Sequence, residues 1–278
     1  MSDIFKTPSR IIVTCSKRHT TYLEQEIIEL GYTPVRTFVT GVELLGTVND
    51  CIVLNLNLRC CSQVLYSLKE FPANGPDQVY DNLIQYPWEE LLKPDGYFSI
   101  TSNADHFTIN NELFVNVKVK DAIADRMRRE TSRRPDSGSV KEGAVFHLYW
   151  KEEQAEIFLD TSGETLAKHG YRKIPGKAPM MESLAAATVL ATKWDRTSPF
   201  VNPMCGSATL AIEAALIAAK IPPGTFRASF AFERWPGFDA ELYKLIREKQ
   251  MERITDTEVK LLGNELNKWV LEKAKANI

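Results

Sequence analysis

The sequence predicts an α+β N-terminal half followed by an α/β C-terminal part. In the first 71 residues, strand-like and helix-like segments alternate at short intervals. From Met181 onward, Ala-rich helical segments alternate with short apolar strands. Residues 168–180 are rich in Gly, Pro and Lys and lie between these two regions. We therefore expect an α+β front, a linker, and a doubly wound parallel sheet.

The composition is that of a globular protein without a membrane span. Of the 278 residues, 44% are hydrophobic and 25% are charged, and the net charge is −2. No apolar run is long enough for a span or a signal peptide, so a cytoplasmic location is expected. The five Cys and four His lack the spacing of metal ligands. We expect reduced thiols and no metal site.

The first elements predict a ferredoxin-like unit. Residues 10–16 are strand-like, 21–32 have helical spacing with a stop at Gly31, and 42–48 form another strand. Residues 50–71 begin with helical spacing and continue into an extended piece. This order of strands and helices is typical of a ferredoxin-like α+β unit.

A second α+β segment follows. It contains a short helix around Trp88, a turn at 93–96 and a strand at 97–102. A helix, with a cap expected near Asn116, should end before Pro135. Residues 144–163 read as a hairpin of two alternating strands.

The helix of this second segment is rich in basic residues. From Lys118 to Arg134 there are seven basic residues against three acids. Such a cluster can contact phosphates in a nearly neutral protein, although a solvated helix face would have the same pattern. The predicted phosphate contacts are Lys118, Lys120, Arg126, Arg133 and Arg134; Arg129 is left out because it could face the core.

In the C-terminal part, a turn of small residues connects a strand to a helix. The stretch "VNPMCGSATL" (201–210) brings Cys205-Gly206-Ser207-Ala208-Thr209 to a helix start, where unpaired N–H groups face a ligand and Gly206 allows close approach. Glu265 follows the next strand, 259–262, where an acid can bind a ribose diol. A turn serving only packing, and a Glu serving only the helix dipole, are the alternatives.

These stretches resemble the bacterial THUMP-domain RNA methyltransferases, and among them the 23S ribosomal RNA guanine-N2 methyltransferases. The resemblance rests on residues 171–224 ("YRKIPGKAPMM…IPPG") and on "SFAFERWPGFD". In the N-terminal half it rests on "NLNLRCCSQVLYSLKEFPA", "YPWEELLKPDGYFSI" and "FLDTSGETLAKHGYR". It implies a ferredoxin-like unit (1–60), an RNA-binding THUMP domain (61–167), and part of an S-adenosylmethionine-dependent Rossmann-like domain (168–278).

The resemblance also implies cofactor-binding residues. They are Ala178, Pro179, Glu182, Asn202, Pro203, Cys205, Gly206, Ser207, Thr209, Glu213 and Glu265. Three positions depart from the family pattern. Asn202 stands where Asp is usual, Ala208 where Gly is usual, and His169 where Arg is more frequent, so each removes a charge or adds a methyl group.

The catalytic loop that the resemblance implies, Asn/Asp-Pro-Pro-aromatic, does not occur in the sequence. The one Pro-Pro pair, Pro222-Pro223, follows Ile221 and precedes Gly224. The strand before the small-residue turn should also have an unpaired edge. We therefore expect no catalytic residue here, and a truncated, split or degenerate chain whose sheet a partner chain or self-association would complete.

Three functions follow from these observations. The first is an RNA methyltransferase by descent, inactive as this chain alone. The second is an RNA-binding protein or fragment without methyl transfer. The third, a dinucleotide oxidoreductase, is disfavoured because the turn lacks the three-glycine fingerprint.

Overall fold

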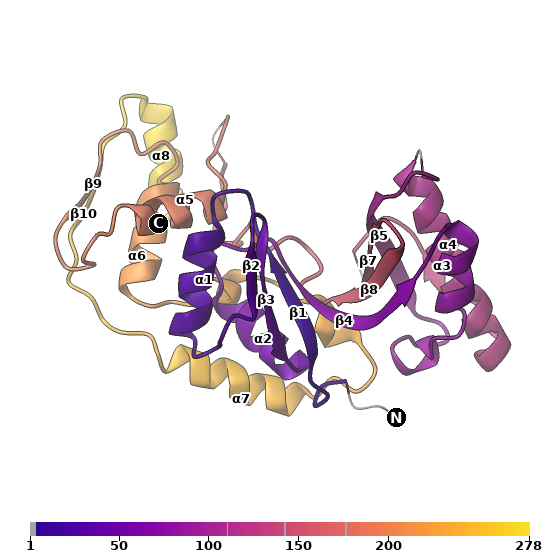
Figure 1. The fold of residues 1–278 in the computed structure, drawn as a ribbon. Coiled ribbons are helices and arrows are strands. Elements are labelled where there is room, and N and C mark those ends of the chain that lie inside the picture. The colour runs from indigo at the N-terminus through magenta and orange to yellow at the C-terminus, as the bar shows by residue number, and fades with distance from the viewer. Residues whose placement is uncertain (1–3, 110, 142, 176) are drawn as a thin grey trace.

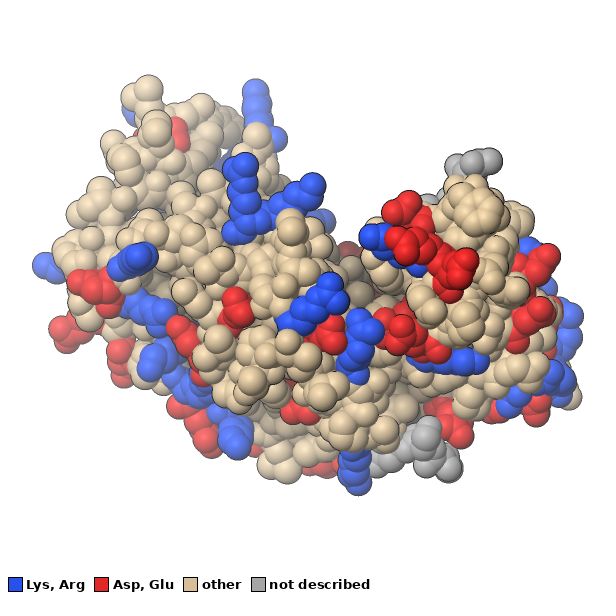
Figure 2. All heavy atoms as spheres, in the orientation of Figure 1, with Lys and Arg blue, Asp and Glu red and all other residues tan. Residues whose placement is uncertain are grey.

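The computed structural model describes residues 4–109, 111–141, 143–175 and 177–278. Figure 1 shows two lobes joined by one curved sheet, and the space-filling view in Figure 2 shows a hollow between them. The predicted linker includes Gly176, which lies outside the described residues.

The first unit has the predicted ferredoxin-like order. Its elements are β1 (Ser9–Thr14), α1 (Thr20–Glu29), β2 (Arg36–Phe38), β3 (Gly41–Gly46), α2 (Val48–Asn57) and β4 (Gln63–Pro72). Alternation along β1 buries Ile11 and Val13 in the main core, whereas Ile12 faces a small cluster on the other side of the sheet. α2 begins at a capping box in which Thr47 and Asp50 bond each other's backbone N–H groups.

The second unit continues the same sheet. Its elements are α3 (Pro76–Leu83), the 3₁₀ turn η1 (Trp88–Glu90), β5 (Tyr97–Asp105), α4 (Glu112–Thr131), β6 (Asp136–Ser137), β7 (Ala144–Lys151) and β8 (Gln154–Asp160). The strand order is β2-β3-β1-β4-β8-β7-β5-β6. β4 pairs with β1 and β8, with an irregular register between Ser67 and Lys69. The predicted boundary at 60/61 thus falls just before a strand shared by both units.

The predicted start of the basic helix is wrong. α4 begins at Glu112, and its N-cap is Asn111, whose side chain accepts a hydrogen bond from the Leu113 N–H. Asn116 lies inside the helix. A helix start is visible in sequence when its first turn continues the apolar stripe that faces the core. Leu113 and Phe114 are exposed, so the first turn of α4 has no such stripe and its start could not be recognised.

The C-terminal part contains two parallel strands and the helices around them. Its elements are α5 (Glu182–Ala191), β9 (Phe200–Asn202), α6 (Thr209–Ala218), η2 (Pro223–Phe226), η3 (Ala231–Arg234), α7 (Ala240–Met251), β10 (Leu261–Gly263) and α8 (Lys268–Asn277). α5 and α6 pack together against Phe200 and Leu261. The expected doubly wound sheet is represented, in the described part of the chain, by β9 and β10.

One face and both edges of this strand pair are open among the described residues. Val201 and Leu262 are partners in the ladder and are 60% and 57% exposed. β9 pairs only with β10 among the described residues, as expected for the open edge. Figure 1 shows the pair at the outer edge of one lobe.

Part of the C-terminal segment packs on the ferredoxin-like unit. α7 lies along α2 (Figure 1), and Asn57 of α2 donates a hydrogen bond to Gln250 of α7. A Cβ on Gly224 would lie 2.7 Å from the Leu56 Cα, so the chain passes α2 at backbone contact. Pro222 and Pro223 are buried beside this contact. They pack against α2 and do not form a substrate loop.

Candidate functional site

The turn after β9 has the conformation that small residues allow. Gly206 has a φ of +55° and Ala208, the N-cap of α6, has a φ of +70°. A Cβ on Gly206 would meet no atom within 4 Å, so there is space for a side chain at this position. Glycine is favoured here because of the positive φ. Ala208 in the left-handed region costs about 1–2 kcal/mol, which gives a physical reason for a glycine there.

Hydrogen bonds connect this turn to the end of β10. The Asn264 N–H donates to the Asn202 carbonyl over 3.0 Å, and the Cys205 N–H donates to the Asn264 carbonyl over 2.8 Å. The Gly206 N–H donates to the Glu265 carboxylate over 3.1 Å. The structure thus brings the predicted ribose acid to the predicted cofactor turn, and Glu265 accepts one of the turn's own amide protons.

A cavity of about 580 Å³ opens beside the turn. Six of the predicted cofactor residues line it, namely Ala178, Pro179, Cys205, Gly206, Ser207 and Thr209. Its volume is in the range of small-molecule sites, and the first turn of α6 forms one wall. The lining therefore suits a nucleoside cofactor bound by backbone donors.

The cavity wall also contains residues that the sequence analysis missed. They are Lys177, Met180, Met204, Leu210, Asn267, Trp269, Val270 and Lys273. The Asn267-Lys268-Trp269 start of α8 could have been found as a helix N-terminus after a strand. The segment around Lys177 and Met180 has no periodic signal. Its place in the wall depends on tertiary contacts.

Five predicted residues do not line the cavity: Glu182, Asn202, Pro203, Glu213 and Glu265. Asn202 is 6% exposed, and its Nδ2 finds no partner among the described residues. A buried unpaired amide is costly, so the Asn202 Nδ2 is a candidate donor to a group bound at the end of β9. Cys205, which does line the cavity, is a thiol whose pKa is raised by burial and, to a smaller extent, by the Glu265 carboxylate. The thiol therefore stays protonated and packs as a small apolar group.

Glu213 lies behind the turn, in a pair with His169. The His169 Nδ1 is 2.7 Å from the Glu213 carboxyl and its Nε2 is 3.0 Å from the Arg59 carbonyl. Because a carbonyl only accepts, Nε2 must donate, and one further proton lies between Nδ1 and the carboxyl. The net charge of the pair is therefore zero whether the imidazole or the carboxyl group holds that proton. Burial and the Glu213 carboxyl raise the pKa of Tyr171 beside them.

The His169–Glu213 pair belongs to a contact between α6 and the ferredoxin-like unit. The Arg59 guanidinium donates to the carbonyls of Leu216, in the last turn of α6, and Ile221, just after the helix. Glu26 of α1 accepts the Arg59 and Cys60 N–H groups, and its burial raises its pKa. His169 is thus part of a buried contact between the C-terminal part and the ferredoxin-like unit.

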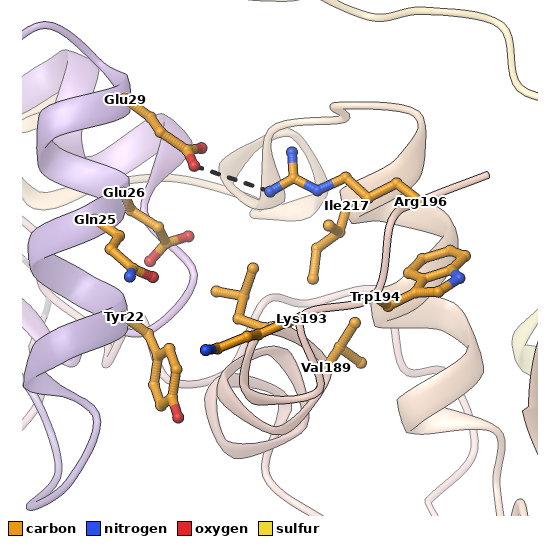
Figure 3. Close-up of a pocket in the computed structure, with 10 residues that line it drawn as sticks. Tyr22, Gln25, Glu26, Glu29, Val189, Lys193, Trp194, Arg196 and Ile217 are labelled. Carbon is orange, nitrogen blue, oxygen red and sulfur yellow. Dashed lines mark ion pairs between the residues drawn. The ribbon is translucent and has the colours of Figure 1, made fainter. Parts of the chain in front are cut away.

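Figure 3 shows a smaller cavity at the same contact, of about 210 Å³. Tyr22 and Glu29 of α1 face Lys193, Trp194 and Arg196, which follow α5. An ion pair of 3.9 Å joins Arg196 to Glu29. Lys193 and Arg196 follow the C-terminus of α5, where the helix dipole is negative and favours cations. This arrangement is common in contacts that serve only structure.

The predicted RNA-binding residues lie along and after α4, and three of the five are ion-paired. Lys118 is 2.6 Å from Asp77, Arg126 is 2.5 Å from Glu89, and Arg134 is 3.7 Å from Asp121. Figure 2 shows acidic and basic side chains interspersed over this lobe. Lys120 and Arg133 pair with no acid in the described part of the chain. The local positive field is therefore weaker than the count of basic residues indicates.

Three family models match consecutive parts of the chain. The RlmL ferredoxin-like domain matches residues 10–65, the THUMP domain residues 73–160, and the RMKL-like methyltransferase domain residues 169–278. No described helix is long and apolar enough to cross a membrane.

Curated relatives agree with these matches. The ribosomal RNA large subunit methyltransferase K/L of Methylococcus capsulatus is 35% identical over 263 residues, which are 92% of this chain and 36% of the relative. The protein of the same name from Pseudomonas paraeruginosa is 30% identical over 286 residues, covering 100% of this chain and 39% of the relative. The chain thus spans little more than a third of the length of these relatives.

Solved structures show the same arrangement of domains. A Listeria monocytogenes protein described as a predicted N6-adenine-specific DNA methylase has a TM-score of 0.88 at 28% identity, covering 98% of this chain and 71% of that one. The methyltransferase SMU.472, complexed with SAH, has a TM-score of 0.86 at 28% identity, covering 98% and 72%. The chain thus contains, in this order, a ferredoxin-like domain of the RlmL type, a THUMP domain and a match to the RMKL-like methyltransferase domain, which is the domain set of the RlmL-like family.

Proposed function

We propose that this chain is the RNA-binding and cofactor-binding part of an S-adenosylmethionine-dependent methyltransferase that acts on 23S ribosomal RNA at a guanine N2. The observation that carries the proposal is the cavity beside the β9–α6 turn, lined by six residues of the predicted cofactor set. The curated relatives with the same domains are named for large-subunit ribosomal RNA. A cytoplasmic location follows from such a substrate.

The residues present suit the cofactor. Backbone N–H groups at the start of α6 would hold polar groups of the ligand, and Gly206 leaves room for close approach. Glu265 would exchange its bond from the Gly206 N–H for bonds from a ribose diol. S-adenosylmethionine, when bound, supplies an electrophilic methyl group. The buried Nδ2 of Asn202 would find an acceptor in the ligand or in a water beside it.

Methyl transfer itself needs groups that the described residues do not supply. The family's Asn/Asp-Pro-Pro-aromatic loop is absent from the sequence, and Pro222 and Pro223 are buried against α2. We therefore propose that this chain by itself binds cofactor and RNA without transferring a methyl group. A second polypeptide, or another copy of this chain, would pair with the open edge of β9 to complete the sheet.

Calorimetry and a methyl-transfer assay test the proposal. Titration of SAH into the chain should give one-site binding, and A178W, which fills the cavity, should abolish it. Fragments of unmodified 23S RNA should bind more tightly than a DNA duplex of equal length. With tritiated S-adenosylmethionine and either nucleic acid, no label should be transferred. Absence of SAH binding would contradict the proposed cofactor site, and preference for DNA would favour the activity described for the Listeria protein.

A further inference from the structure

The cofactor cavity is enclosed by three segments that are distant in sequence. They are residues 177–180, residues 204–210 and the start of α8 at 267–273. Residues 204–210 include the end of a β–α turn, and α8 is a helix, so backbone hydrogen bonds stabilise both. Residues 177–180 have no regular secondary structure. Side-chain contacts must therefore hold this wall in place.

Arg172 connects that wall to α5 and α6. Its guanidinium donates to the Met180 carbonyl and, over 3.1 Å, to the Thr209 hydroxyl at the start of α6. The same group lies 3.7 Å from the Glu182 carboxylate in the first turn of α5. The Arg172 side chain is 12% exposed and does not line the cavity. The planar Arg172 guanidinium thus fixes the distance between the wall at residues 177–180 and the wall at residues 204–210.

Asn277 makes a second connection, from α8. Its Oδ1 accepts the N–H groups of Lys173 and Ile174 over 3.0 and 2.9 Å. Its Nδ2 donates to the carbonyls of Ile174 and Ser207 over 3.0 and 3.3 Å. Asn277 is 8% exposed, and its amide uses both the oxygen and the nitrogen in these four hydrogen bonds. This amide joins the loop, the small-residue turn and the last turn of α8.

We infer that Arg172 and Asn277 are positioning residues that fix the walls of the cofactor cavity before the cofactor arrives. Neither residue lines the cavity. Arg172 joins residues 177–180 to the start of α6, and Asn277 joins α8 to the small-residue turn. Binding to a cavity with ordered walls avoids the entropy cost of ordering them, which strengthens affinity. The inference rests on the proposed cofactor site.

Paired variants with matched controls test it. R172A and N277L should each weaken SAH binding, measured by calorimetry on the whole chain, by about tenfold, because each leaves a wall disordered. R128A and N82A remove an Arg and an Asn from the surface of the THUMP lobe and should change the affinity by less than about twofold. Hydrogen exchange of the Lys173 and Ile174 amides should accelerate in N277L, with an unchanged rate in the core of the eight-stranded sheet.

Conservative variants separate positioning from a general loss of folding. N277D keeps both acceptor bonds, so the amides of residues 173 and 174 should stay protected. It loses both donor bonds, to the carbonyls of Ile174 and Ser207, and should still weaken SAH binding. R172K should restore part of the affinity that R172A loses. SAH binding by R172A and N277L as tight as that of the wild type would overturn the inference. A wild-type chain that binds no SAH would instead overturn the proposed function, and the inference with it.

Discussion

The His169 ring and the Glu213 carboxyl are 2.7 Å apart, and both side chains are almost completely buried, at 1% and 0% exposed. The pair joins the cofactor helix α6 to the ferredoxin-like unit, because His169 also donates to the Arg59 carbonyl. A buried ionisable pair is tolerated only while both members are present.

Removing one member should therefore be costly. H169A leaves the Glu213 carboxyl buried without its partner, and we expect a loss of about 3–5 kcal/mol in the free energy of unfolding. Urea unfolding measures it. The control is E272A, which breaks an exposed pair with Lys275 and should cost less than about 1 kcal/mol. Equal effects of the two variants would contradict the role of the buried pair.

Ala208 should be replaceable by glycine with a gain in stability. A208G relieves a left-handed φ of +70°, which costs Ala about 1–2 kcal/mol, and the greater freedom of Gly in the unfolded chain offsets part of this. We expect a net gain of up to about 1 kcal/mol in thermal or urea unfolding. The matched control, A211G inside α6, should lose about 1 kcal/mol. A loss in A208G as large as that in A211G would show that strain at this position is absent.

Asn202 should influence which form of the cofactor binds. N202D places a carboxylate at the end of β9, where the side chain is buried and its Nδ2 is unpaired. Because S-adenosylmethionine carries a sulfonium charge that SAH lacks, the carboxylate should attract it and shift the ratio of the two affinities toward S-adenosylmethionine by about tenfold, which corresponds to about 1.4 kcal/mol. Calorimetry with both ligands measures the ratio. An unchanged ratio would place Asn202 outside the reach of that charge.

Lys120 in α4 and Arg133 just after it, which pair with no acid among the described residues, should contribute most to RNA binding. K120Q/R133Q should lower affinity and reduce the slope of log K against log salt by about 0.9 for each lost contact to a duplex phosphate. K118Q/R134Q removes residues already paired with Asp77 and Asp121, so a smaller change is expected. Filter binding at several salt concentrations provides the slopes. An identical slope for wild type and K120Q/R133Q would exclude this surface.

Asp160 should make stability depend on pH between about 4 and 6. Burial raises its pKa to about 6, although the Ser162 and Gly163 N–H groups stabilise the carboxylate. Because the folded state then binds the proton more tightly than the unfolded state, stability falls as pH rises through this window and is constant above it. Two pKa units correspond to about 3 kcal/mol.

D160N should remove that pH dependence. Urea unfolding from pH 4 to pH 8 compares the variant with the wild type. The control is D77N, at an exposed carboxylate of α3, which should leave the profile unchanged. A profile in D160N as steep as in the wild type would assign the titration to another group.

Local patterns in the sequence determined most of the elements. The alternation in residues 10–16 and the capping box at Thr47 are set by neighbours within a few residues, so β1 and α2 were predictable. The small-residue turn was predictable for the same reason, since Gly206 and Ala208 adopt conformations that bulky side chains avoid. The start of α4 was not, because Asn111 and Asn116 are both good caps in sequence and the exposed first turn has no buried apolar stripe that would distinguish them.

The sequence by itself determined the order of the units, the β9–α6 turn and the acid that follows β10. Only the tertiary structure decided which residues act together there: Arg172 across from Thr209, Asn277 between Ile174 and Ser207, and Glu213 turned away from the cavity toward His169. The physical reason is the separation along the sequence over which each kind of interaction acts. Periodicity and turn chemistry act over a few residues, whereas these contacts join residues 37 to 103 positions apart and form only when the helices pack.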